Sequence, residues 1–407
     1  MAISPTRWQR LRAELFGSRV DGLVSIALIA AMAAIATGLI KWALFQAQWA
    51  VIQANSTLFA VGRYPIEQQW RLWWLTALLA AATGLSWGLL RALPRADRSA
   101  EPWPFNDRLA VLLVLALALV VPAWLRLTLE IQGRWWGIAL VLVALRWLAG
   151  RLGPQLPQPL RRLLPLIWPL LYLVGMVLIS GGLGLMAVAP SDFGGLLLTL
   201  LEASFAILLC FPLGLLLALG RRSELPLLRW GSVLYIEFIR GAPLITLLFL
   251  GQNILGFLLP GGLAPDRVWR AAWVLTFFAA AYVAEALRSG LTAVPRGQLE
   301  AAQSLGLSMP QALIRVVLPQ ALRVALPAVV GDFITLLQDT TLLSLIGLLD
   351  LLGIARTVMA NPAFLGKNAE VYLVLAVLFW CCCAALGLGS RALETRLNPN
   401  RQPAPAR

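Results

Sequence analysis

The sequence predicts an all-α, polytopic membrane protein with about ten transmembrane helices, and composition and run length support this. Of its 407 residues, 60% are hydrophobic and 13% are charged, and the mean hydropathy is +0.80. A soluble domain carries roughly 25% charged residues. Several apolar runs reach the roughly 18–20 residues that a helix needs to cross a bilayer. A transmembrane β-barrel is not expected, because its strands alternate apolar and polar residues.

We expect spans at about 23–45, 72–90, 109–125, 132–149, 163–180, 196–219, 232–257, 269–287, 324–346 and 371–389. The first run is too long for the apolar core of a signal peptide and lacks a small-residue cleavage site. Arginine and lysine are denser in the loops that face inward when the N-terminus is cytoplasmic, as the positive-inside rule requires. Both termini are therefore expected in the cytoplasm.

The net charge of +14 follows from this topology and from attraction to anionic lipid. The basic residues are dispersed among the loops, so a nucleic-acid partner is not expected. The chain has no histidine, which removes the commonest metal ligand and general base. The cysteines are Cys210, Cys381, Cys382 and Cys383; they lack metal-ligand spacing and are interpreted as apolar packing residues.

A polar segment, GQLEAAQSLGLSMPQALIRVVLPQAL, interrupts the apolar runs at residues 297–322. Its first part favours a helix, and Gly306 is expected to end that helix because glycine tolerates a left-handed turn. Ser308 and Gln311 have the spacing of a capping box. Pro310 falls in the first turn of the next helix, where its missing N–H costs little.

We therefore expect a helix, a turn and a second helix that lie along the cytoplasmic membrane surface, with Pro319 at the junction to the next span. Ala301 and Ala302 are expected to form a bare patch that a partner protein approaches closely. Glu300 either contacts that partner or only favours its helix terminus.

The segment contains Gly297, Glu300, Ala301, Ala302, Gly306, Leu318 and Pro319. Their spacing resembles the EAA signature of the membrane subunits of binding-protein-dependent ABC importers. The flanks LYIEFIRGAPLITLLF, AAYVAEALRSGLTAVP and ITLLQDTTLLSLIG are similar to the polar amino acid permease family, the histidine/glutamine type, over roughly residues 192–394. Val316 stands where the signature prefers Ile, and Gln338 stands where many relatives carry Lys.

Residues 1–190 form an N-terminal extension with about five spans, which resembles the larger permease subunit of general L-amino acid importers. Residues 191–394 form the permease domain, of the type I ABC importer kind, and 395–407 a cytoplasmic tail. The resemblance implies a bacterial inner-membrane permease for polar or general L-amino acids. It also implies a periplasmic binding protein and a cytoplasmic ABC ATPase pair, which docks at residues 297–319.

The residues themselves place the ATPase on another chain. A phosphate-binding loop needs G-x-x-x-x-G-K-[ST], and neither Lys41 nor Lys367 fits it. The chain is therefore expected to be no enzyme and to bind no cofactor, with ATP and magnesium on the partner. One EAA segment per chain implies a second permease subunit, because ABC ATPases work as two-fold pairs. In the long subgroup this subunit is usually a related, shorter chain.

Polar residues at membrane depth are candidates for the translocation path, because such residues face a cavity or a partner. The candidates are Asn253, Tyr282, Glu285, Gln338, Asp339, Thr340, Thr341 and Ser344. Structural pairings compete with this interpretation: Glu285 with Arg288, Asp339 with Thr340, and Glu237 with Arg240.

An ion-coupled secondary transporter is the alternative function. It predicts inverted repeats and interrupted helices in both halves, and residues 1–190 show no repeat of the second half. A membrane enzyme has less support, because no convincing nucleophile and base are found.

Overall fold

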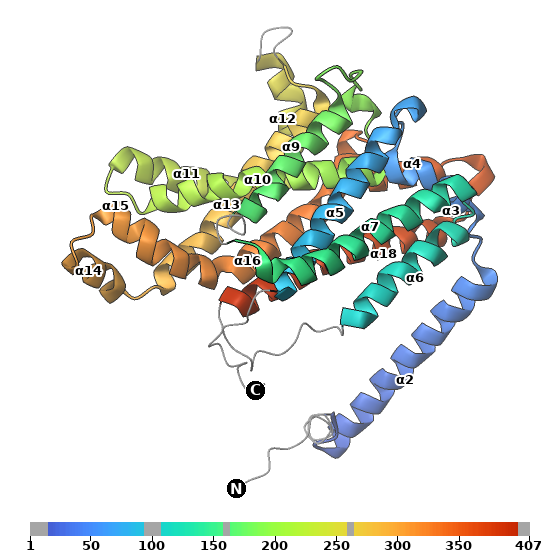
Figure 1. The fold of residues 1–407 in the computed structure, drawn as a ribbon, viewed down its shortest axis with the longest axis horizontal. Helices are drawn as coiled ribbons and strands as arrows, with labels where there is room; N and C mark the ends of the chain where they lie inside the picture. The colour runs from blue at the N-terminus through green and yellow to red at the C-terminus, as the bar shows by residue number, and fades with distance from the viewer. Residues whose placement is uncertain (1–14, 93–106, 158–162, 259–263, 398–407) are drawn as a thin grey trace. The chain divides into compact units, whose positions relative to one another are not determined.

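The computed structural model describes residues 15–92, 107–157, 163–258 and 264–397 (Figure 1). Every regular element in these ranges is a helix. The β-type pairings in these ranges are isolated bridges, such as that of Gly62 with Phe193. The predicted all-α fold is confirmed for the described residues.

The chain divides into two compact units, Met1–Val51 and Ile52–Arg407. In the first unit, α2 (Arg19–Lys41) continues into the π-helical η1 (Trp42–Gln46). The Ser18 side chain accepts a hydrogen bond from the Asp21 N–H and caps α2. No residue of α2 is buried, as expected for an apolar helix that faces lipid.

The second unit begins with helices of the extension: α3 (Ala50–Ala54, which begins in the first unit), α4 (Ser56–Val61), α5 (Trp70–Ala92), α6 (Asp107–Trp124), α7 (Leu129–Leu152) and α9 (Ile167–Ser180). Helices α5 and α7 pack closely because glycine lies at their contact. A Cβ atom on Gly84 would lie 2.3 Å from the Leu142 carbonyl oxygen, and one on Gly88 would lie 2.2 Å from that of Arg146. Small residues allow such close helix packing in membranes.

The C-terminal helices are α10 (Gly195–Arg221), α11 (Pro226–Gly241), α12 (Leu244–Leu258), α13 (Arg267–Ala293), α14 (Arg296–Ser304), α15 (Met309–Ala312), η6 (Leu313–Val317), α16 (Leu318–Asp339), η7 (Thr340–Ile346), α17 (Leu351–Met359) and α18 (Asn368–Leu397). The core lies where α13 packs between α10 and α16. A Cβ atom on Gly214 would lie 2.8 Å from Val283, and one on Gly290 would lie 2.4 Å from the Ala321 carbonyl oxygen.

Among the described residues, seven helices are long and apolar enough to cross a membrane. Two shorter apolar helices, Arg108–Trp124 and Leu164–Ser180, add to these. A further pair, Pro226–Gly241 and Leu244–Ile254, is bent by 106°. All ten predicted spans therefore fall on helices.

The seventh predicted span, 232–257, differs from the structure because it is broken rather than continuous. Ala242 adopts an extended backbone with φ −94° and ψ 135°. The next residue, Pro243, disfavours helical backbone in the residue before it and cannot donate an N–H. The chain therefore turns sharply between α11 and α12.

The ninth predicted span, 324–346, also begins earlier than expected. Helix α15 continues through η6 into α16, and Met309–Ile346 forms one apolar helical run. The second helix of the predicted helix–turn–helix is thus not a separate surface helix. Pro319 lies inside this run, in the first turn of α16 and directly after the π-helical η6.

Candidate functional site

We define the coupling loop as residues 297–319, and α14 forms its first half. Helix α14 ends at Ser304 with Leu305 as its C-cap, and Gly306 follows with φ +84°. The Gly306 N–H donates to the Gln303 carbonyl at 2.9 Å and the Leu307 N–H to that of Ala302 at 3.2 Å. This is the glycine-ended helix terminus that the sequence predicts.

The second half of the loop begins at a capping box formed by Ser308 and Gln311. The Ser308 N–H donates to the Gln311 side-chain oxygen at 3.2 Å. The predicted capping box is therefore confirmed. The Gln320 side chain donates to that of Gln298 at 3.3 Å and joins α14 to the first turns of α16.

The exposed surface of the coupling loop is narrower than the sequence suggests. Ala301 is exposed, whereas Ala302 is 4% exposed and packs inside its own chain. The bare patch therefore contains Ala301 without Ala302. Its exposed neighbours are Gly297, Glu300, Gly306 and Pro319, and Leu318 is half-buried.

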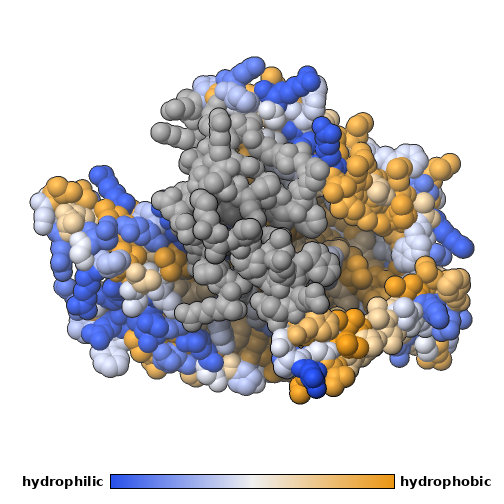
Figure 2. All heavy atoms as spheres, turned by 90° about the horizontal axis from the view of Figure 1, so that it is seen from below, coloured by the Kyte–Doolittle hydropathy of each residue, from blue (hydrophilic) through white to orange (hydrophobic). Residues whose placement is uncertain are grey.

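Two large apolar side chains add to this surface. Leu305 and Met309 are 84% and 51% exposed on either side of the turn. Figure 2 shows hydrophilic residues gathered at the end of the second unit that carries α14 in Figure 1. The centre of a protein contact is depleted of charged residues, and these two side chains supply apolar area within the otherwise polar loop. The sequence interpretation did not include them, although large apolar residues in a polar loop are a usable signal.

A cluster of ionised side chains lies in the half of the helices nearest the coupling loop. We call it the inner ion cluster: Arg221, Glu237, Arg240, Glu285 and Arg288. The Glu285 carboxylate accepts from the Arg288 Nε at 2.8 Å. It also lies 3.4 Å from Arg221 and 3.9 Å from Arg240. Charges at this depth need such partners.

The predicted pairing of Glu285 with Arg288 is thus confirmed, and that of Glu237 with Arg240 is wrong. Glu237 instead pairs with Arg221 of α10 at 3.1 Å. The spacing of three residues placed Glu237 and Arg240 on one helix face, but the neighbouring helices supply closer partners.

Tyr282 lies beside the inner ion cluster. The Arg240 guanidinium lies 5.5 Å from the centre of its ring, within the range of a cation–π contact. Arg240 is also the charge that acts on Asp332 of α16. One Asp332 carboxylate oxygen is buried without a hydrogen-bond partner in the described residues. Arg240, Tyr282 and the Glu285 carboxylate thus gather here, and Asp332 is within electrostatic range of Arg240.

The other predicted path residues do not join this cluster. The hydroxyls of Thr340, Thr341 and Ser344 donate to carbonyls of their own helical turns. The predicted bond between Asp339 and Thr340 is therefore absent, since Thr340 donates to Leu337. Asp339 is half-buried. Exposed Asn253 donates to Phe249 in its own helix, and Gln338 lies 3.8 Å from the Cys383 sulfur.

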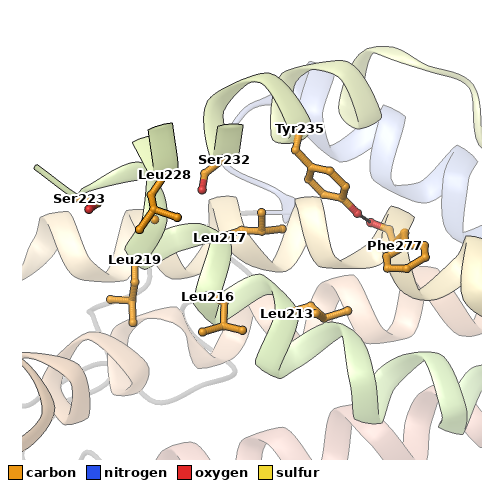
Figure 3. Close-up of a pocket in the computed structure, with 10 residues that line it drawn as sticks. Leu213, Leu216, Leu217, Leu219, Ser223, Leu228, Ser232, Tyr235 and Phe277 are labelled. Carbon is orange, nitrogen blue, oxygen red and sulfur yellow. Dashed lines mark hydrogen bonds between the residues drawn. The ribbon is translucent and has the colours of Figure 1, made fainter. Parts of the chain in front are cut away.

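A cavity of about 560 Å³ lies between α10, α11 and α13 (Figure 3). Its walls are leucines from α10 and α11 with Phe277, and its polar groups are mainly Ser223, Ser232 and Tyr235. The Tyr235 hydroxyl donates to the Phe277 carbonyl at 2.8 Å, so it is already satisfied. An apolar wall does not bind both charges of an amino acid, and we do not assign the substrate to this cavity.

At the end opposite the coupling loop, which we call the outer end, Gly62 and Tyr64 contact residues 179–194. A Cβ atom on Gly62 would lie 2.4 Å from the Gly194 Cα, so two backbones touch there. Gly62 also has φ +64°, which favours glycine. The Tyr64 hydroxyl donates to the Ile179 carbonyl at 2.9 Å, and its ring stacks on Phe193.

Two buried acids at the outer end were not predicted. Glu202 of α10 and Asp350, the N-cap of α17, are both 0% exposed. Burial raises the pKa of Asp350 to about 7. The signal for Glu202 was present, because it is the one acidic residue in the apolar run 196–219, and an acid inside a span is unusual.

Comparisons with known proteins agree with this organisation. Residues 210–399 match the family described as Binding-protein-dependent transport system inner membrane component. The chain is 37% identical over 86% of its length to the glutamate/glutamine/aspartate/asparagine transport system permease protein BztC of Rhodobacter capsulatus, of which 78% is covered. It is 32% identical over 97% of its length to the inner membrane amino-acid ABC transporter permease protein YhdY of Escherichia coli, of which 94% is covered.

A shorter relative matches only half of the chain. The probable glutamine ABC transporter permease protein GlnP of Bacillus subtilis is 36% identical over 50% of this chain and 91% of its own length. BztC and YhdY thus share most of the chain, including much of the extension. The chain therefore belongs to the binding-protein-dependent ABC transporter permeases of the polar amino acid family, and over most of its length it is similar to the long members BztC and YhdY.

Proposed function

We propose that this permease carries acidic amino acids and their amides: glutamate, glutamine, aspartate and asparagine. As a family member, the chain is the inner-membrane permease subunit of an ABC importer for polar amino acids and does not itself hydrolyse ATP. The identity of 37% to BztC, whose name gives these four substrates, supports the narrower range.

The coupling loop is the contact for the ATPase subunit. The carrying observation is Gly297, which lies in the first turn of α14. A Cβ atom there would meet nothing within 4 Å, and no positive φ requires glycine. Exposed glycine in a helix is unfavourable by roughly 0.5–1 kcal/mol relative to alanine. No contact within the chain explains a glycine at position 297, whereas the close approach of a partner surface explains it.

Gly297, Glu300, Ala301, Gly306 and the exposed Leu305 present one surface to that partner. Ala302 supports it from inside, and Leu318 with Pro319 connects it to α16. Because α16 continues directly from the loop, a force on the loop reaches the membrane without a hinge. The ATPase works as a two-fold pair, so a second, related permease subunit supplies the other loop.

The translocation path passes the inner ion cluster. Tyr282 and Glu285 line it together with Arg240 and Asp332, whose opposite charges suit the carboxylate and ammonium ends of an amino acid. Asn253, Gln338, Asp339, Thr340, Thr341 and Ser344 remain proposals for other parts of the path. Their hydroxyl and amide contacts within the chain leave accepting positions open.

The extension, residues 1–190, holds the outer end of the permease domain, residues 191–394. The contacts of Gly62 with Gly194 and of Tyr64 with Ile179 support this role. Arg71 of α5 is 2% exposed and donates to the Met186 carbonyl at 2.7 Å. The outer end faces the binding protein, and both termini are cytoplasmic.

Photocrosslinking tests the docking proposal. A photoreactive residue at Ala301 or Leu305 is expected to crosslink to the ATPase in the assembled complex. The same residue at Leu129, which is 78% exposed at the start of α7, is the control and is expected not to. Crosslinks at Leu129 and none at the loop would show that the ATPase docks elsewhere.

A further inference from the structure

The two buried acids at the outer end lie at one junction between α10 and α17. Glu202 is on the same face of α10 as Thr199, three residues earlier. Thr199 is 1% exposed, and its hydroxyl accepts from the Leu351 N–H at 3.0 Å. The Asp350 backbone pairs with Gly195 at the start of α10. The charge of Asp350 is the one that acts on Glu202.

Asp350 has an evident role and a compensated charge. Its carboxylate accepts from the N–H groups of Leu352 at 3.1 Å and Gly353 at 3.0 Å. It therefore caps α17, and the positive end of the helix dipole favours its ionised form. Arg356, in the second turn of α17, adds a more distant positive charge.

Glu202 has no such compensation. Both of its carboxylate oxygens are buried without a hydrogen-bond partner among the described residues. The hydroxyl oxygen of Tyr172 in α9, a residue on which the Glu202 charge acts, is likewise without one. A buried ionised carboxylate without a positive partner is strongly unfavourable. A proton would also neutralise Glu202, and the Tyr172 hydroxyl oxygen is available to accept the new O–H, so the test has to separate a proton from a metal ion.

We propose that Glu202 binds a monovalent metal cation of the sodium type, with Thr199 and Asp350 completing the site. All the available groups are oxygens, which hard cations prefer. The single positive charge of the cation offsets the Glu202 carboxylate, while the N-terminus of α17 offsets the Asp350 carboxylate. The described residues contain no group of three acidic, histidine or cysteine side chains suited to a metal ion, so a divalent ion is not favoured.

The site is separate from the transport path proposed above. It lies at the outer end, whereas the inner ion cluster lies near the coupling loop. Its role is to hold α17 against α10. The proposal therefore does not depend on the proposed substrate range or on ATPase docking, and its failure would leave both intact.

Thermal unfolding of the purified full chain in detergent tests the proposal. Sodium chloride and choline chloride are compared at equal ionic strength over a range of concentrations. A ligand that binds only the folded state raises the unfolding midpoint in a saturable way. We expect such a rise with sodium, and we expect Glu202→Gln to weaken the apparent sodium affinity by about tenfold or more, because the anionic ligand is lost.

The matched control is Glu67→Gln, an exposed acid in the turn before α5, which is expected to respond to sodium as the wild type does. Equilibrium dialysis of the wild type with radioactive sodium gives a measurement that needs no variant. Equal midpoints in sodium and choline with no bound sodium would overturn the proposal. A midpoint that depends on pH through Glu202 but not on sodium would also overturn it and assign a proton instead.

Discussion

Glu285 of α13 lies 3.4 Å from Arg221 of α10. The same carboxylate reaches Arg240 of α11 and Arg288 of its own helix. One acid therefore holds together three helices at the end that carries the coupling loop. Helices that share one half-buried acid cannot separate there without breaking ion pairs, which gives the inner ion cluster a part in the transport cycle.

Replacing Glu285 with Gln is expected to leave three arginines close together without their shared acid. We expect a loss of folding free energy on the order of 1 kcal/mol, because the carboxylate is partly exposed and charged hydrogen bonds are replaced by weaker ones. In the assembled importer, basal ATP hydrolysis without binding protein is expected to rise. Glu130→Gln is the control, since its partner Arg134 lies on the same helix at the surface; an equal rise there would remove any special role from Glu285.

Three replacements of Gly306 separate the effect of backbone strain on stability from the effect of a large side chain on ATPase docking. Gly306→Ala is expected to destabilise the chain by about 1–2 kcal/mol because φ is +84°, and Gly306→Asn by less, since asparagine tolerates this region. Neither side chain clashes within the chain, because a Cβ there meets nothing within 4 Å. Gly306→Arg is expected to insert normally yet lose the ATPase on purification. Normal ATPase retention by Gly306→Arg would show that the turn does not face the partner.

The outer end is expected to be sensitive to backbone crowding. Gly62→Ala places a methyl group 2.4 Å from the Gly194 Cα at φ +64°, so it is expected to destabilise the second unit by about 1–3 kcal/mol. Gly133→Ala is the matched control, because nothing lies within 4 Å of a Cβ there. Unfolding in detergent by denaturant compares the two. Equal stabilities would mean that the extension does not hold the permease helices through this contact.

Ionisation of the Asp350 carboxyl group is expected to make the stability of the folded chain depend on pH. Burial raises the pKa of this carboxyl group from the ordinary value of 3.8 to about 7. A raised pKa in the folded state means that stability is full at low pH and is lost as pH rises through about 7. We expect the unfolding midpoint in choline chloride to fall between about pH 4 and 7. Asp350→Asn should abolish this fall while keeping the cap.

The charges of Glu202 and Arg356 act on Asp350, so variants of these two residues serve as controls. Glu202→Gln removes a neighbouring negative charge and is expected to move the pH transition downward. Arg356→Gln removes a positive charge and is expected to move it upward. A midpoint that is independent of pH in the wild type would contradict the burial of an ionisable Asp350.

The sequence predicted the helices and the local geometry of the coupling loop well. Apolar run length located each span, and the rules for Gly306, Ser308 and Gln311 hold because they depend on residues close in the chain. The break at Pro243 was readable in principle, since proline disfavours a continuous helix, but the apolar run on both sides hid it.

Contacts between distant residues were much less predictable. The pairing of Glu237 with Arg221 and the burial of Ala302 depend on how separate helices pack, which local spacing does not determine. Glu202 and Asp350 are 148 residues apart in the chain, and their juxtaposition arises only when α10 and α17 meet. Thr340, Thr341 and Ser344 of η7 donate hydrogen bonds to carbonyls within their own helical turns. Their spacing in the sequence does not show whether their side chains do this or face a common path.

The most direct test of the whole account is uptake of radiolabelled glutamate into proteoliposomes. The vesicles would contain this chain, its companion permease and the ATPase, with binding protein outside and ATP enclosed or absent. We predict uptake that requires both ATP and binding protein and that unlabelled glutamine, aspartate and asparagine reduce. Uptake that proceeds without ATP and follows an imposed ion gradient would contradict the account.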